Sequence, residues 1–170
     1  MDALEAILSR RVQRAFAATP VEAEKLAKIT DAGRHAMSAR NLQPWRFVII
    51  QDRSRLKDIG ALCTTGKFVA DAPAAIVVLK EAANARWAAI DCAHAIQNMA
   101  NVAWAVGLGT CWVGNFDAAK VAALIGAPAE WEVLTVLPFG YANPQNPPQA
   151  KPLKPRREVV SFERFGNQNP

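Results

Sequence analysis

A long apolar stretch, residues 86–106, constrains the fold of this chain more than any other part of the sequence. Its alanine-rich composition and the glycine that follows it, Gly107, predict one continuous helix. Large apolar side chains occur nearly all round that helix, so we expect it to be buried on every side, either in a core or in a subunit interface. His94 lies on the same helix, and we expect it to be a buried, hydrogen-bonded structural residue.

The same stretch carries too many polar groups to cross a membrane, among them Asp91, Gln97 and Asn101. Hydrophobic residues make up 51% of the 170 residues and charged residues 21%, a composition that excludes a disordered chain. The N-terminal residues do not resemble a secretory signal, because acidic residues precede the first arginines. Three cysteines lie far apart and suggest reduced, buried thiols in a cytoplasmic protein.

Helices and apolar strands alternate along the rest of the chain. Strands are predicted over residues 45–51, 74–79, 111–113 and 132–137, and a strand-like pattern resumes at Val159, Val160 and Phe162. Helices are predicted after the Asp2–Glu5 pair, from Thr19-Pro20, over residues 53–62 and after Asp117. The apolar run 74–79 suits a central strand buried on both faces. This order predicts a single domain over residues 1–170, of α/β or α+β class, in three layers.

The positive charge is concentrated near the two ends of the chain. The formal net charge is +5, and seven of the 20 Lys and Arg residues lie in two clusters: Arg10, Arg11, Arg14, Lys151, Lys154, Arg156 and Arg157. Residues 142–157 also hold five of the 11 prolines, which predicts an extended arm. A solvated surface, a nucleic-acid face and a site for a compact anion such as phosphate remain open. A nucleic-acid face would more often spread along a helix, and two small clusters suit a compact anion such as one phosphate just as well.

Six segments, in order, resemble the nitroreductase family of FMN-dependent oxidoreductases. They are SRRVQRAF at 9–16, SARNLQPWRF at 38–47, the segment 68–79, the Asp91 to Met99 part of the long helix, GLGTCWVGNF at 107–116, and Lys154-Pro155-Arg156. Each segment alone is weak, but together they cover most of the chain at fitting spacings. The resemblance implies a nitroreductase-like α+β fold in three layers, with a central mixed or antiparallel sheet flanked by helices. It also implies a homodimer that holds FMN at its interface, with the C-terminal arm wrapping the partner.

The resemblance also implies which residues bind FMN. It assigns the phosphate to Arg10, Arg11, Lys154 and Arg156, and the pyrimidine side of the ring to Arg14. A polar loop would contact the ribityl chain and the ring edge through Ser38, Ala39, Arg40, Asn41 and Gln43, although these side chains could instead stabilise the loop itself. The backbone of Trp112, Val113, Gly114 and Asn115 would run beside flavin N5. Two positions depart from the family pattern, because Val12 and Ala39 replace hydroxyl-bearing residues.

The implied function is an NAD(P)H-dependent oxidoreductase of the nitroreductase kind. Hydride would pass from NADH or NADPH to flavin N5 and then, in a ping-pong cycle, to a small-molecule acceptor such as a nitroaromatic or a quinone. The cofactor carries the chemistry, so no catalytic side chain is required, and no metal-ligand spacing is present. A non-catalytic flavin store or redox sensor on the same fold is the alternative, and a nucleic-acid-binding protein is a more distant one.

Overall fold

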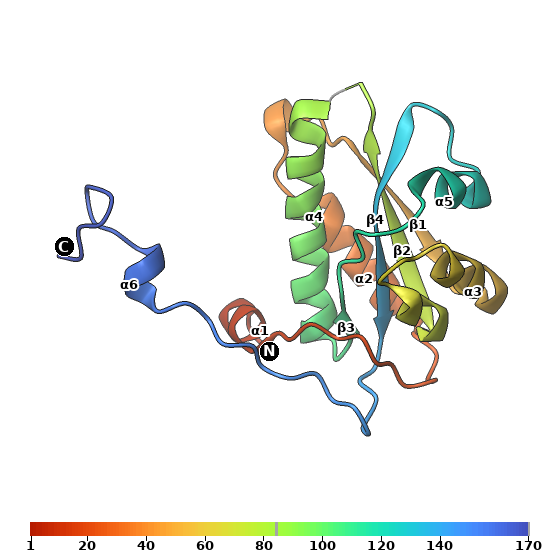
Figure 1. The fold of residues 1–170 in the computed structure, drawn as a ribbon, viewed down its shortest axis with the longest axis horizontal. Coiled ribbons are helices and arrows are strands. Elements are labelled where there is room, and N and C mark those ends of the chain that lie inside the picture. The colour runs from red at the N-terminus through yellow and green to blue at the C-terminus, as the bar shows by residue number, and fades with distance from the viewer. Residues whose placement is uncertain (84, 170) are drawn as a thin grey trace.

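In a computed structural model, the chain forms a four-stranded antiparallel sheet with helices on both faces (Figure 1). The structure describes residues 1–83 and 85–169, apart from the side chains of residues 85 and 86. The strand order is β1-β2-β4-β3, with β1 at Trp45–Ile50, β2 at Ala74–Glu81, β3 at Gly109–Thr110 and β4 at Trp131–Gly140. This arrangement confirms the predicted α+β fold in three layers.

Six α-helices and two short 3-10 helices accompany the sheet in the described residues. The α-helices are α1 (Ala3–Ser9), α2 (Ala23–Arg34), α3 (Arg53–Ala61), α4 (Ala85–Ala105), α5 (Ala118–Ile125) and α6 (Arg156–Val159). The 3-10 helices are η1 (Ala39–Asn41) and η2 (Lys67–Asp71). Three of the α-helices begin at an Asp whose carboxylate accepts a backbone N–H: Asp2, Asp52 and Asp117.

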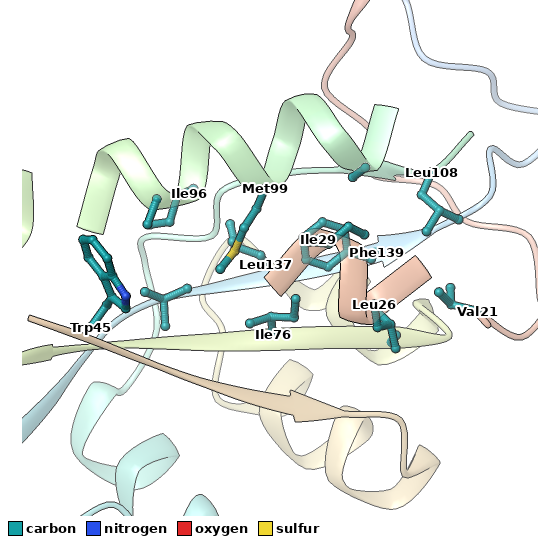
Figure 2. Packing of buried hydrophobic residues seen from close by; sticks show 14 of the residues in the cluster. Val21, Leu26, Ile29, Trp45, Ile76, Ile96, Met99, Leu108, Leu137 and Phe139 are labelled. Atoms are coloured by element: carbon teal, nitrogen blue, oxygen red, sulfur yellow. The ribbon is translucent and has the colours of Figure 1, made fainter. Parts of the chain in front are cut away.

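Strand β2 lies between two hydrophobic cores. Ile76 and Val78 pack with α2 and α4 on one face, and Ala75 and Val77 pack with α3 and α5 on the other. Figure 2 shows the first core, with Met99 of α4 pointing toward the sheet. Full burial of a side chain of this size stabilises the fold by about 1.5–3 kcal/mol. The continuous apolar run therefore has the physical cause that we expected, because both of its faces are covered.

Several predicted boundaries differ from the structure. Helix α2 begins at Ala23 rather than at Pro20, because Val21 is drawn into the core and its carbonyl accepts a hydrogen bond from Gln51. The predicted strand 111–113 is wrong: β3 comprises Gly109–Thr110, and Val113 only forms an isolated bridge with Val136. The strand-like pattern from Val159 is also wrong, since α6 ends there and an irregular segment follows.

Helix α4 is not buried on every side in the single chain. Trp87 is 43% exposed and Ile90 is 48% exposed, and His94 on the same face is exposed. The expectation of a buried structural histidine is therefore wrong. Outward apolar side chains also occur on α1, where Leu4, Ile7 and Leu8 are more than half exposed. The prediction that α4 lies in a subunit interface stays a prediction.

The C-terminal segment leaves the body as an extended arm that includes α6 and continues beyond it (Figure 1). Its first part is anchored, because the carbonyl of Ala15 accepts a hydrogen bond from the Asn143 N–H and Phe16 forms an antiparallel bridge with Ala142. Pro148 further along lines a cavity together with Ser9 of α1. The arm thus passes from the end of β4 to the side of α1.

Candidate functional site

Two cavities have Arg14 in their walls. One, of about 220 Å³, is lined by Arg14, Thr65, Gly66, Phe68, Cys111, Trp112 and Val113. The other, of about 330 Å³, lies between residues 12–15 and residues 146–151 of the arm, and Lys151 contributes a second cation there. Neither cavity has a carboxylate in its described wall. The pair therefore suits a ligand that has an anionic part and a flat, partly apolar part.

Backbone pairing directs Arg14 into this site. Val12 forms a parallel bridge with Thr110, and the Gln13 N–H donates to the Thr110 carbonyl at 3.0 Å. Successive side chains alternate in an extended segment, so Gln13 points inward, where its Nε2 donates to the Gly140 carbonyl at 3.0 Å, and Arg14 points outward. Gly109 leaves room for Gln13, since a Cβ there would lie 2.1 Å from Gln13 Oε1.

Trp112 also lines the smaller cavity and is 45% exposed. Its indole lies against Gly114, whose Cβ, if present, would be 3.3 Å from Trp112 Nε1. Gly66 allows the neighbouring segment to approach closely, because a Cβ there would be 2.2 Å from Val113 Cγ1. Of the segment 112–115, Trp112 and Val113 line the cavity, and the Val113 N–H donates to the Val136 carbonyl at 3.1 Å.

The predicted loop contains unusual backbone geometry. Arg40, Asn41 and Gln43 have φ angles of 52°, 56° and 51°, in the left-handed region that non-glycine residues rarely adopt. Each such residue costs on the order of 1–3 kcal/mol, and such strain clusters at functional sites. Ser38 Oγ accepts from the Gln43 N–H at 3.1 Å, and Gln43 Nε2 donates to the Asn41 carbonyl at 3.2 Å. These bonds within the loop are the alternative role that the sequence left open for its side chains. The Ala39 N–H, by contrast, is held from outside the loop by Asp91.

The two basic clusters differ in their contacts. Arg11 Nη1 donates to the carbonyls of Leu8, Ser9 and Arg10 at 3.2, 2.7 and 3.0 Å, and so caps the end of α1. Arg10 follows the same helix and is half-buried. Lys154 and Arg156 lie exposed on the arm, and in the described residues no hydrogen bond or ion pair joins either side chain to the body.

The single chain thus brings together some predicted site residues and not others. Arg14, Trp112 and Val113 share one cavity. The arm residue that lines a cavity together with Arg14 is Lys151. It belongs to the C-terminal basic cluster but was not among the residues predicted to bind FMN. The residues that were missed include Thr65, Gly66, Phe68 and Cys111, which line the smaller cavity, and Asp91. Only Gly66, in a Thr-Thr-Gly turn pattern, carried a local signal for a close approach.

The cysteines and other polar groups give no sign of a second reactive centre. Burial raises the pKa of the Cys63 thiol, and burial together with the Asp91 charge raises the pKa of Cys92 to about 12. Both thiols are therefore protonated and unreactive at neutral pH. No group of three His, Cys, Asp or Glu side chains in the described ranges is placed to hold a metal ion. Of the helices formed by the described residues, none combines the length and apolar character needed to cross a membrane.

Comparison with known proteins identifies the family. A model of the nitroreductase family matches residues 7–66 and 62–141. The chain belongs to the nitroreductase family of oxidoreductases. A protein of Methanothermobacter thermautotrophicus named NADH dehydrogenase/NAD(P)H nitroreductase is 33% identical over 149 residues, which are 83% of this chain and 78% of that protein. The resemblance inferred from the sequence motifs is confirmed.

Solved structures of nitroreductase-family proteins have the same fold. A protein of Bacteroides thetaiotaomicron with the same name superposes with a TM-score of 0.86 at 28% identity, over 96% of this chain and 98% of that one. An FMN-dependent nitroreductase of Clostridium difficile superposes with a TM-score of 0.84 at 25% identity, over 95% and 99% of the two chains. These family members and the present chain are therefore similar in length as well as in fold.

Proposed function

We propose that this chain is an FMN-dependent oxidoreductase that passes hydride from NADH or NADPH to a small-molecule acceptor, such as a nitroaromatic or a quinone. The observation that carries the proposal is the pair of cavities at Arg14, which offer cations and amides and no carboxylate in their described walls. The names of the relatives support it: the Clostridium difficile protein is called FMN-dependent, and the archaeal relative is called an NAD(P)H nitroreductase.

The residues around the cavities fit FMN in their chemistry. Arg14 and Lys151 provide positive charge, Thr65 provides a hydroxyl, and Phe68 and Trp112 provide aromatic surface. Thr110 Oγ1, beside this site in the chain, is the only buried side-chain N or O atom among the described residues that has no hydrogen-bond partner. A buried hydroxyl without a partner costs free energy unless a water or a ligand satisfies it.

Each part of the site has a distinct role in this proposal. FMN, when bound, supplies the hydride-transfer chemistry, and the protein supplies binding, orientation and electrostatics. Arg14 would hold the pyrimidine side of the ring and stabilise negative charge there. The backbone of residues 112–115 would run beside the reactive edge, with the N–H groups of Trp112, Gly114 and Asn115 toward it, since that of Val113 donates to the Val136 carbonyl. Arg10, Arg11, Lys154 and Arg156 would hold the phosphate, with the loop residues Ser38, Ala39, Arg40, Asn41 and Gln43 along the ribityl chain and ring edge.

A homodimer is part of the same proposal. Leu4, Ile7 and Leu8 of α1 and Trp87 and Ile90 of α4 are large apolar side chains that the single chain leaves exposed. Exposed apolar surface of this kind is typical of a protein–protein interface. A second copy would cover it and would give the arm of each chain a surface to pack on, so that both chains contribute to each FMN site.

An absorption spectrum of the purified protein, followed by identification of the flavin that heating releases, tests the proposal. We expect a yellow protein with one FMN per chain and a dimeric mass by light scattering. Addition of NADH or NADPH without oxygen should bleach the flavin band, and a nitroaromatic or quinone should restore it. A protein that is colourless and does not bind added FMN contradicts the proposal.

The same experiment separates the enzyme from a flavin store or sensor. A store would bind FMN and bleach slowly or not at all. Val12 lacks the hydroxyl of the family pattern, but its contact with Thr110 is made by the backbone, so the substitution leaves that pairing intact. We favour the enzyme because the relatives are named as an NAD(P)H nitroreductase and an FMN-dependent nitroreductase.

A further inference from the structure

Two consecutive residues of α4 hold the two ends of the loop that the proposed function places at the flavin. Asp91 Oδ2 accepts a hydrogen bond from the Ala39 N–H at 3.1 Å. Cys92 Sγ lies 3.6 Å from the carbonyl oxygen of Pro44, to which its S–H can donate. Both side chains are buried, with Asp91 3% exposed and Cys92 0% exposed. Helix α4, which packs in the main core, therefore contacts the backbone near both ends of the loop.

Asp91 is an unusual residue in this position. A buried carboxylate is costly unless hydrogen bonds or an opposite charge compensate it. In the described part of the chain no ion pair involves Asp91, so its compensation comes from hydrogen bonding. A bond between an ionised acceptor and a backbone N–H is stronger than a neutral one. The cost of burying this charge is thus coupled to the conformation of the loop.

The loop has no equivalent restraint of its own at Ala39. Ser38 occupies the N-cap position of η1, yet its hydroxyl accepts from the Gln43 N–H and makes no capping bond to the turn. The Asp91 carboxylate takes the place of that cap by accepting the first N–H of η1. Arg40, Asn41 and Gln43 are all left-handed, and such a backbone persists only where its surroundings over-determine it.

We propose that Asp91 is a positioning residue for flavin binding, which acts through the Ala39 amide and keeps the loop 38–43 in its strained, binding-competent conformation. This inference rests on the proposed function, because it takes the ligand of the loop to be FMN. Asp91 itself touches the loop backbone and not the ligand. Its removal should let the left-handed residues relax toward ordinary backbone conformations and should misplace the polar groups of the loop.

Two substitutions of Asp91 and one control test this role. Asp91→Ala removes the acceptor, whereas Asp91→Asn keeps an oxygen acceptor of the same size without the charge. Asn98→Ala is the matched control, because Asn98 is also on α4 and its Nδ2 donates to a backbone carbonyl, that of Ala32 on α2, at 3.3 Å. Two quantities are measured on the full-length protein: the hydrogen-exchange rate of the Ala39 amide, with and without FMN, and the Kd for FMN from fluorescence quenching.

We expect Asp91→Ala to speed exchange at Ala39 at least tenfold and to weaken FMN binding roughly tenfold or more, the effect of one lost charge-assisted bond. Asp91→Asn should speed the exchange several-fold and leave the Kd within about threefold, because the amide oxygen still accepts. Asn98→Ala should change neither quantity. If Asp91→Ala does not fold, the exchange at Ala39 in Asp91→Asn decides, and an unchanged rate there overturns the inference.

The outcomes separate this inference from the proposed function. A wild-type protein that binds no FMN contradicts the proposed function and with it the flavin role of Asp91. A wild-type protein that binds FMN while Asp91→Ala binds it equally well contradicts the role of Asp91 alone. Equal losses in Asp91→Ala and Asn98→Ala would also overturn it, because they would show a general destabilisation of α4 rather than positioning of the loop.

Discussion

The central strand β2 and the loop 38–43 represent two different ways in which this chain holds its backbone. In β2 the side chains of residues 74–78 are fully buried, and ladder hydrogen bonds to both neighbouring strands continue along its length. In the loop, three of six residues are left-handed, several side chains are exposed, and the Ala39 N–H depends on one distant carboxylate. The strand is held by many redundant contacts and the loop by a few specific ones.

This difference explains why the groups available to a ligand lie in the loop and its neighbouring segments rather than in the central strand. The side chains of residues 74–79 of β2 pack only in the two cores, so they have no group available for a ligand. The loop and the segments at residues 12–16 and 109–115 leave some backbone and side-chain groups accessible, and each is fixed by a few specific contacts, such as the bond from Gln13 Nε2 to the Gly140 carbonyl. Changes in the core should therefore reduce the free energy of unfolding, whereas changes at the site should reduce ligand affinity.

Ile76→Ala should have the largest effect. Ile76 is 0% exposed in the core between the sheet and α4, so its truncation removes buried apolar contacts and leaves a cavity. We expect the free energy of unfolding to fall by about 2–5 kcal/mol, measured by urea denaturation. Leu153→Ala is the control, because Leu153 is 90% exposed on the arm, and it should change that quantity by less than about 0.5 kcal/mol. Equal losses in the free energy of unfolding for the two variants would contradict the view that stability comes mainly from the core contacts of the central strand.

Gly109→Ala should come next, because it disturbs the boundary between core and site. The new Cβ would overlap Gln13 Oε1 and displace the side chain that donates to the Gly140 carbonyl. We expect a loss of about 1–3 kcal/mol in the free energy of unfolding and weaker FMN binding, because Arg14 adjoins the displaced residue.

Gly114→Ala is the comparison for Gly109→Ala. Its Cβ would only approach the Trp112 indole, at 3.3 Å, so a smaller stability loss is expected. Combining Gly109→Ala with Gln13→Ser, which removes the overlapping atoms, should cost less than the sum of the two single changes. Strict additivity in that double-mutant cycle would show that Gly109 is not needed to accommodate Gln13.

The sequence predicted well the elements that are held by many core contacts, and poorly the contacts that depend on one or two distant residues. The apolar run of β2 and the long α4 have strong patterns, because burial selects the same residue type at many positions. The exposure of His94 was missed because it depends on which face of α4 is left uncovered. Asp91 was missed as a loop contact because 52 residues separate it from Ala39, and no local pattern reports such a bond.

The sequence motifs predicted several residues of the site, but not how distant segments come together to form it. Arg14 and Trp112 were assigned from the family resemblance, and the structure places both in one cavity wall. The sequence could not predict that Arg14 and Lys151 line one cavity, because this depends on the path of a proline-rich arm that has no periodic pattern. For the same reason, the helical turn at α6 could not be distinguished from a strand by three apolar residues.

Arg14→Gln should weaken FMN binding with little change in stability. Arg14 is exposed and lies in the walls of both cavities, so the substitution removes a charged donor from the site and no packing from the core. We expect the Kd for FMN to rise about tenfold to thirtyfold, measured by fluorescence quenching. Lys57→Gln makes the same change in net charge on α3, at an exposed position outside both cavity walls, and should leave the Kd unchanged. A rise in Kd shared by both variants would indicate a general electrostatic effect.

Cys92→Ser should have the smallest effect at neutral pH and a measurable one in alkali. Burial and the nearby Asp91 charge raise the pKa of Cys92 to about 12 from an ordinary value of 9.0, so the folded state keeps a thiol proton that the unfolded state loses. The resulting stability is complete below pH 9 and is lost as the pH rises toward 12, by up to roughly 1.4 kcal/mol per pH unit. Serine does not titrate in this range and can still donate to the Pro44 carbonyl, so the wild type should lose stability faster than the variant above pH 9. If the free energies of unfolding of the two proteins change in parallel from pH 9 to 11, the pKa of Cys92 is not raised in the folded state.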